Sequence, residues 1–154
     1  MFQGPTLRDK LALPDDIKKA VEMRNWGQVD RLCSGLALQG GNLFETLRPL
    51  AGQKRIEFII NVRDARNPWE EDGIWHDDGS RIMAFTMGLN LRPETITGGN
   101  LLIRRKGDKD ALSFSPPGFG ELIVFRTGVD GYEHKVQAVV EGLRVVMAGW
   151  CYSD

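Results

Sequence analysis

Two histidines and one nearby carboxylate are the residues of this 154-residue chain with the clearest potential for chemistry. His76 and His134 are its two histidines, and Asp78 follows the first by two positions. Residues two apart in a strand face the same side of a sheet, so His76 and Asp78 can point into one cavity. Two imidazoles and one carboxylate are the facial ligand set of non-haem Fe(II), which leaves coordination positions open for substrates. The spacing predicts His76, Asp78 and His134 as metal ligands and catalytic residues.

The neighbouring Asp77 is the main alternative within this set. A turn at this point could aim Asp77 into the cavity instead, but strand alternation favours Asp78. His134 completes the site only if its strand lies beside the segment of His76. A lone histidine is usually structural, so the prediction depends on the combination of all three residues with an arginine ten positions after His134.

That arginine, Arg144, interrupts an otherwise apolar segment that runs from Leu143 to Met147. A charged side chain in such a strand is costly to bury unless it has an anionic partner. Arg144 therefore pairs with an internal acid, or lies at a strand edge with its guanidinium in water, or binds a carboxylate-bearing ligand. A guanidinium binds such a ligand well through two parallel hydrogen bonds. Alternation also places Trp150 on the same face as Arg144, where it would form a wall of the pocket.

Composition limits the class of protein and its partners. Hydrophobic residues make up 42% and charged residues 27%, which is typical of a soluble globular chain of one domain. The net charge of −1 gives no general attraction to nucleic acid, and no apolar run is long enough to cross a membrane. The N-terminus lacks the pattern of a signal peptide and the two cysteines lack metal-binding spacing, so we expect a cytoplasmic protein. The sequence gives no expectation for its oligomeric state.

The pattern of elements predicts a helical layer over about 6–50 and a β core over about 55–154, within a single domain of residues 1–154. Residues 1–5 resemble a viral 3C-protease site and are left out of this prediction. Apolar stripes at helical spacing end at glycines in the first part. Many short strands separated by turns follow, which favours a jelly roll with helices packed on one sheet. The expected strands are 56–62, 74–77, 82–91, 100–105, 111–114, 122–126, 134–140 and 143–151.

From residue 76 onward the chain resembles the 2-oxoglutarate- and Fe(II)-dependent oxygenases, specifically the prolyl-4-hydroxylase-like branch. That branch carries, in order, His-x-Asp, Tyr-Leu-Asn, Gly-Gly-x-Leu, a proline-containing turn, Leu-x-x-Phe, His-x-Val and Gly-x-Arg, and then a tryptophan. The matching segments are His76-Asp77-Asp78, Leu89-Asn90, Gly98-Gly99-Asn100-Leu101, Pro116-Pro117, Leu122-Ile123-Val124-Phe125, His134-Lys135-Val136, Gly142-Leu143-Arg144 and Trp150.

The resemblance implies a double-stranded β-helix, Fe(II) as the metal, and 2-oxoglutarate and O2 as cosubstrates. It implies that Arg144 and Trp150 contact 2-oxoglutarate and that an aliphatic C–H is hydroxylated. The substrate would be a protein or peptide residue such as proline, or a free small molecule. Trp69, in the polar loop before His76, is the candidate substrate contact. The alternative is a cupin-type metal- or ligand-binding protein that is non-catalytic or does not use 2-oxoglutarate.

Two departures from the branch concern the cosubstrate. Gly88 stands where the branch often has a tyrosine that helps to hold 2-oxoglutarate. Val146 and Ala148, on the predicted face of Arg144, carry no hydroxyl group. The distal carboxylate of 2-oxoglutarate therefore has fewer obvious partners here than in the branch.

Overall fold

The computed structural model describes residues 4–154, so the first three residues of the segment that resembles a protease site lie outside it. Its centre is a five-stranded antiparallel sheet in the order β1-β7-β3-β10-β2. The strands of this large sheet are β1 (Thr6–Lys10), β2 (Arg55–Arg63), β3 (Met83–Gly88), β7 (Glu121–Arg126) and β10 (Arg144–Tyr152).

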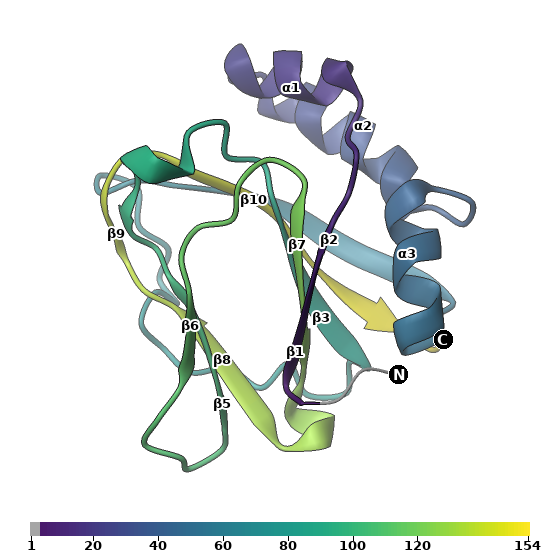
Figure 1. Ribbon diagram of the computed structural model, residues 1–154, viewed down its shortest axis with the longest axis vertical. Coiled ribbons are helices and arrows are strands. Elements are labelled where there is room, and N and C mark those ends of the chain that lie inside the picture. Colours follow the sequence, from purple (N-terminus) through teal and green to yellow (C-terminus); the bar gives the residue numbers. More distant parts are fainter. Residues whose placement is uncertain (1–3) are drawn as a thin grey trace.

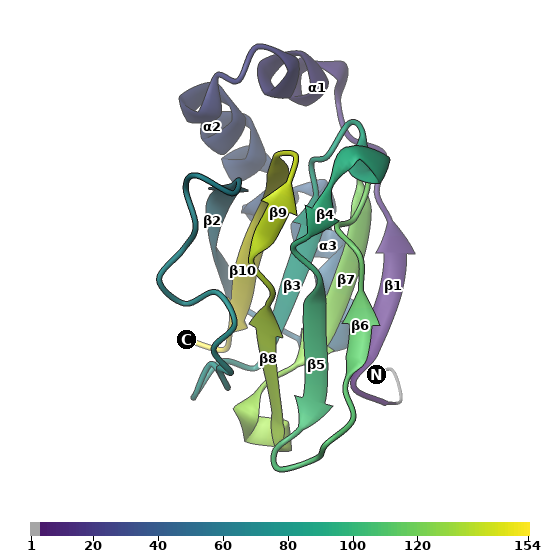
Figure 2. The same cartoon turned by 90° about the vertical axis from the view of Figure 1, so that its left-hand side faces the viewer.

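Two smaller sheets form a second layer, which faces the large sheet (Figure 2). One has the order β6-β5-β8 and the other pairs β4 with β9. The strands of this layer are β4 (Thr97–Gly98), β5 (Leu101–Arg105), β6 (Leu112–Phe114), β8 (Tyr132–Val136) and β9 (Val139–Glu141). The two layers form the predicted jelly roll, and the active-site candidates lie between them.

Three helices cover the opposite face of the large sheet (Figure 1). They are α1 (Asp15–Glu22), α2 (Trp26–Ala37) and α3 (Asn42–Ala51), and two short 3-10 turns occupy Pro93–Thr95 and Gly128–Asp130. The N-terminus of α2 is capped because the Asn25 side chain accepts a hydrogen bond from the backbone N–H of Gln28. Gly52, at φ 61°, ends α3 in the left-handed conformation that glycine adopts without strain.

Strand alternation divides the buried side chains of the large sheet between two cores. Met83, Phe85 and Met87 of β3 pack toward the helices, together with the alternate residues of β10. A smaller apolar cluster, which includes Ala84 and Phe125, lies between the two layers. Since both faces of β3 are covered, all six of its residues are buried. The inner face of the large sheet is the one that carries the polar residues of the site.

The predicted helical layer on a jelly roll is confirmed, and three local predictions need correction. The strand expected over 74–77 is a single bridge at His76, because left-handed residues at Gly73 and Asp78 bend the chain on both sides. The strand expected over 134–140 is divided between β8 and β9. The helical layer also begins with an edge strand, β1, which pairs with β7. Among residues 4–154, no helix has the length and apolar character needed to span a membrane.

Candidate active site

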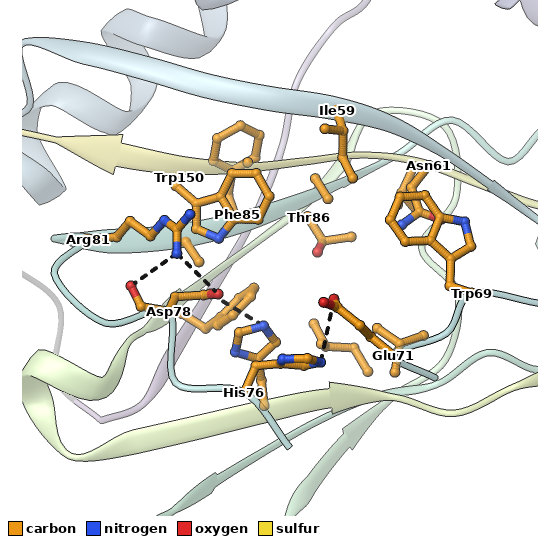
Figure 3. A pocket seen from close by; sticks show the side chains of 18 of the residues that line it. Ile59, Asn61, Trp69, Glu71, His76, Asp78, Arg81, Phe85, Thr86 and Trp150 are labelled. Atoms are coloured by element: carbon orange, nitrogen blue, oxygen red, sulfur yellow. Dashed lines mark hydrogen bonds and ion pairs between the residues drawn. The ribbon is translucent and has the colours of Figure 1, made fainter. Parts of the chain in front are cut away.

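A cleft of about 680 Å³ lies between the two layers, and Figure 3 shows the side chains that line it. Its floor is the inner face of β2, β3 and β10, and its other walls come from β5, β7, β8 and the segment from residue 69 to residue 81. The volume is in the usual range for pockets that bind small molecules. All six residues predicted as site residues line this cleft: Trp69, His76, Asp78, His134, Arg144 and Trp150.

The two histidines are brought together by the backbone. His76 and His134 exchange both N–H···O=C bonds, at 2.7 and 2.8 Å, so they are directly opposite one another in an antiparallel bridge. Their side chains therefore lie on the same face, with ring centroids 6.1 Å apart. The edge contact of His134 with Phe125, at 4.8 Å between centroids, fixes the second ring against β7.

Asp77 and Asp78 point in different directions. The Asp77 carboxylate is exposed, where it accepts hydrogen bonds from Lys106 and from the backbone of Gly79. The Lys106 contact, and then the Gly79 bond, lower its pKa. Asp78 is in the left-handed conformation at φ 58°, and its Oδ2 lies 3.3 Å from Nε2 of His134. Both residues line the cleft, but the turn directs the carboxylate of Asp78, rather than that of Asp77, toward His134.

The donor atoms at this end of the cleft fit a metal ion. Asp78 Oδ2 and His134 Nδ1 are buried without a hydrogen-bond partner among residues 4–154, and such groups are costly to leave unsatisfied. Burial is the main cause that lowers the pKa of His134, with Asp78 opposing it. Burial thus favours the neutral imidazole, which is the form that ligates metals.

The third donor, His76, is turned away from this pair. Its Nε2 lies 3.7 Å from the carboxylate of Glu71, and Figure 3 shows the two side chains pointing toward each other. As a result, no three His, Cys, Asp or Glu side chains in the described part of the chain are positioned to bind one metal ion together. The His76 side chain is 30% exposed, and its ring would have to rotate to join Asp78 and His134 around one ion.

Arg144 lies at the other end of the cleft and is only 1% exposed. Its Nε donates to the carbonyl of Gly99 at 2.8 Å. Within residues 4–154, no carboxylate forms an ion pair with this guanidinium. Burial, and then the neighbouring charge of Arg63, lower the pKa of Arg144 to about 9. The group is still cationic at neutral pH and is therefore a buried charge without a counter-ion.

The cleft has a second buried arginine, Arg63, which the sequence pattern did not indicate as a site residue. It is the register partner of Arg144 on β2, but its Nη1 is 2.5 Å from the carboxylate of Asp72. Asp72 also accepts a hydrogen bond from the backbone N–H of Trp69, and the Arg63 guanidinium stacks over the Trp69 ring at 5.0 Å. This ion pair fixes the loop from residue 64 to residue 73 against the mouth of the cleft.

Trp150 forms the wall beside the metal-binding end. The guanidinium of Arg81 stacks on its ring at 5.0 Å, forms an ion pair with the carboxylate of Asp78 at 3.9 Å, and donates to the hydroxyl of Tyr152 at 2.9 Å. Arg81 thus joins Asp78 to the wall of the cleft (Figure 3). Sequence reasoning did not identify it, because a single arginine after a turn has no distinctive signal.

The glycine at position 88 has a structural cause. A Cβ at Gly88 would collide with the backbone carbonyls of Pro117 and Gly118, which cross directly over β3. The loop is held there by Asn90, whose Nδ2 donates to the Pro117 carbonyl at 2.8 Å. No side chain can therefore occupy the place where the related branch often has a tyrosine.

Residues 64–152, more than half of the chain, match the 2OG-Fe(II) oxygenase superfamily. The chain belongs to this superfamily. It is an Fe(II)- and 2-oxoglutarate-dependent dioxygenase that uses O2 as a cosubstrate, so the alternative of a binding protein without this chemistry is wrong.

One solved structure supports the fold of this oxygenase, and two others are similar over a smaller part of the chain. A prolyl-4-hydroxylase from Pseudomonas putida is similar over 97% of this chain and 89% of its own, with 18% identity and a TM-score of 0.64. An oxidoreductase of the 2OG-Fe(II) oxygenase family from Burkholderia pseudomallei has 18% identity and a TM-score of 0.45 over 66% of this chain and 48% of its own. IDO from Bacillus thuringiensis has 18% identity and a TM-score of 0.47 over 64% and 45%. The comparison with curated proteins gave no match.

Proposed function

We propose that His76, Asp78 and His134 hold Fe(II) in this oxygenase and that Arg144 binds the distal carboxylate of 2-oxoglutarate. The proposal rests on the polar groups at the two ends of one cleft. Within residues 4–154, one end has possible metal ligands without hydrogen-bond partners and the other has a cation without a counter-ion. The metal-binding end has two buried atoms without a hydrogen-bond partner among residues 4–154, which are Oδ2 of Asp78 and Nδ1 of His134. The other end has the buried Arg144 cation, which has no counter-ion among the residues that the structure describes.

The residues of the chain contribute binding and orientation. The bridge between His76 and His134 sets both rings on one face, and Arg81 holds Asp78 and the Trp150 wall together. When Fe(II), 2-oxoglutarate and O2 are bound, they supply the oxidation of an aliphatic C–H bond, with succinate and CO2 as co-products.

We further propose that the substrate is a protein or peptide residue such as proline. The support is the similarity of fold, over nearly the whole chain, to a protein described as a prolyl-4-hydroxylase. Trp69 is the proposed substrate contact, since it lines the cleft and the Arg63–Asp72 pair fixes its loop. An aromatic side chain held in this way presents a flat apolar surface to a pyrrolidine ring.

The metal proposal is tested by anaerobic Fe(II) titration of His76→Ala, Asp78→Ala, His134→Ala and the control Asp77→Ala. The first three should weaken Fe(II) binding and abolish succinate release, whereas Asp77→Ala should do neither, because its carboxylate is exposed on Lys106. Loss of iron from Asp77→Ala together with retention by Asp78→Ala would refute the ligand set.

The substrate proposal is tested by succinate release with proline-containing peptides, with the same peptides in which alanine replaces proline, and with free proline. Peptide-dependent release that needs the proline is the expected result. Release stimulated by free proline, and not by the peptides, would instead assign a small-molecule substrate.

A further inference from the structure

A single hydroxyl group stands on the floor of the cleft between its two ends. It belongs to Thr86 of β3, which is 5% exposed and lines the cavity. Figure 3 shows this side chain projecting into the cavity from the floor, on the side opposite His76. The hydroxyl has no hydrogen-bond partner among residues 4–154. Its oxygen is not one of the fully buried side-chain atoms that lack a partner, so it is open to the cavity.

The position of Thr86 in the sheet explains why its hydroxyl has no partner in the described part of the chain. β3 is flanked by β10 on one side and β7 on the other, so the ladders use the backbone groups around Thr86. Its register partners are Ala148 and Ile123, which offer no polar atom. The hydroxyl can therefore find an acceptor only in the cavity.

The register also places this hydroxyl along the length of the cleft. Thr86 is level with Ala148, two residues from Trp150 and four from Arg144 on the same inner face of β10. At the rise of an extended strand, these separations are about 7 Å and about 14 Å along the strand. Along the cleft, Thr86 therefore lies between Trp150, which is beside Asp78, and Arg144. A 2-oxoglutarate molecule bound to the metal and to Arg144 would extend through this region.

We propose that the Thr86 hydroxyl donates a hydrogen bond to a carboxylate oxygen of 2-oxoglutarate. The inference rests on the proposed roles of Arg144 and the metal ligands. On β10, Val146 and Ala148 offer no hydroxyl to the cosubstrate, and no side chain fits at Gly88. Thr86 supplies this group from the adjacent strand, directly opposite Ala148. It is thus a cosubstrate-positioning residue.

The test is calorimetric titration of 2-oxoglutarate into the Fe(II)-loaded protein without oxygen. Thr86→Val keeps the shape of the side chain and removes the donor, and its Kd should rise about tenfold, which corresponds to about 1.4 kcal/mol. Thr86→Ser should bind within about twofold of the wild type, because it keeps the hydroxyl. The double variant Thr86→Val/Ala148→Thr moves the hydroxyl to the register partner and should regain most of the affinity.

Two controls distinguish a role of Thr86 in positioning 2-oxoglutarate from a role in the stability of the fold. Thr46→Val removes a hydroxyl on α3, which bonds the carbonyl of Asn42 far from the cleft, and should leave the Kd unchanged. Without ligand, Thr86→Val should melt at or above the wild-type temperature, because the lost hydroxyl has no partner to lose.

A Kd for Thr86→Val equal to that of the wild type would overturn the inference, as would Thr86→Ser binding as weakly as Thr86→Val. Failure of the underlying proposal has a different signature, since in that case Arg144→Ala would leave the Kd unaltered as well.

Discussion

Arg63 and Arg144 are opposite one another on adjacent strands, and both are buried beside the same cleft, but their surroundings differ. Arg63 donates to Asn61 and to Asp72, so its charge is neutralised within the protein. Arg144 bonds the Gly99 carbonyl alone and has no carboxylate partner in the described residues. The charge of Arg63 is therefore satisfied before any ligand arrives, and that of Arg144 is not.

The difference shows how to separate a structural cation from a binding cation. A buried charge costs free energy unless it is paired, so a folded protein retains an unpaired one where a ligand completes it. Because Asp72 neutralises Arg63, one positive charge at this end of the cleft is left uncompensated by residues 4–154. One charge matches one carboxylate, as the distal end of 2-oxoglutarate requires. Three predictions could break or sharpen this comparison.

The largest expected effect is on the free energy of unfolding, when the Arg63–Asp72 ion pair is broken. Arg63→Ala should lower the free energy of unfolding by about 3–5 kcal/mol, because it leaves Asp72 buried and unpaired. Arg144→Ala should cost less than half as much, since it strands no carboxylate. Urea denaturation of both variants checks this order. Equal losses would mean that Arg144 also has a structural counter-ion.

A smaller effect is expected from crowding the Arg144 side chain. At Gly99, with φ 70°, an added Cβ would lie 2.9 Å from Cδ of Arg144, so Gly99→Ala should displace the guanidinium. The left-handed alanine should cost about 1–2 kcal/mol of stability, and 2-oxoglutarate binding should weaken severalfold.

Gly107→Ala is the matched control for this strain. Gly107 has φ 86° and nothing within 4 Å of the added Cβ, so this variant should lose similar stability and keep its affinity for 2-oxoglutarate. Parallel urea denaturation and 2-oxoglutarate titrations would detect the difference. Weakened binding in both variants would show that strain, rather than the position of Arg144, sets the affinity.

The smallest expected effect concerns the thiols, which report on opening of the fold. Burial raises the pKa of both Cys33 and Cys151 to about 12, so at pH 8 the reactive thiolate is a minute fraction in the folded state. Alkylation of the wild type should therefore be very slow and should accelerate more in Arg63→Ala than in Arg144→Ala. Mass spectrometry of the labelled protein measures these rates, and rapid labelling of the wild type would contradict the burial.

Much of the site was accessible from the sequence because its pattern is local. Alternation along residues 144–150 assigned Arg144 and Trp150 to one face, and both line the cleft. The side chain of Asp78 also lies in the cleft, although a left-handed turn rather than strand alternation directs it there. Their roles as ligands remain proposals.

The remaining features depend on distant parts of the chain. The Arg63–Asp72 pair requires the path of the loop between these residues, which no periodic pattern encodes. Thr86 was missed because β3 is buried on both faces, so its sequence does not reveal which face meets the cleft. The edge strand β1 consists mostly of polar residues and depends on backbone pairing with β7.

The most direct test of the account is the affinity of Arg144 variants for 2-oxoglutarate, measured by anaerobic calorimetry of the Fe(II)-loaded protein. A hydrogen-bonded contact with a charged group contributes about 1.5–3 kcal/mol, so Arg144→Ala should raise the Kd by about one to two powers of ten. Arg144→Lys should recover only part, because an ammonium group cannot make the planar two-point contact. Fe(II) affinity should hardly change. A variant that melts far below the wild type and yet keeps the wild-type Kd would show that Arg144 is structural and contradict the account.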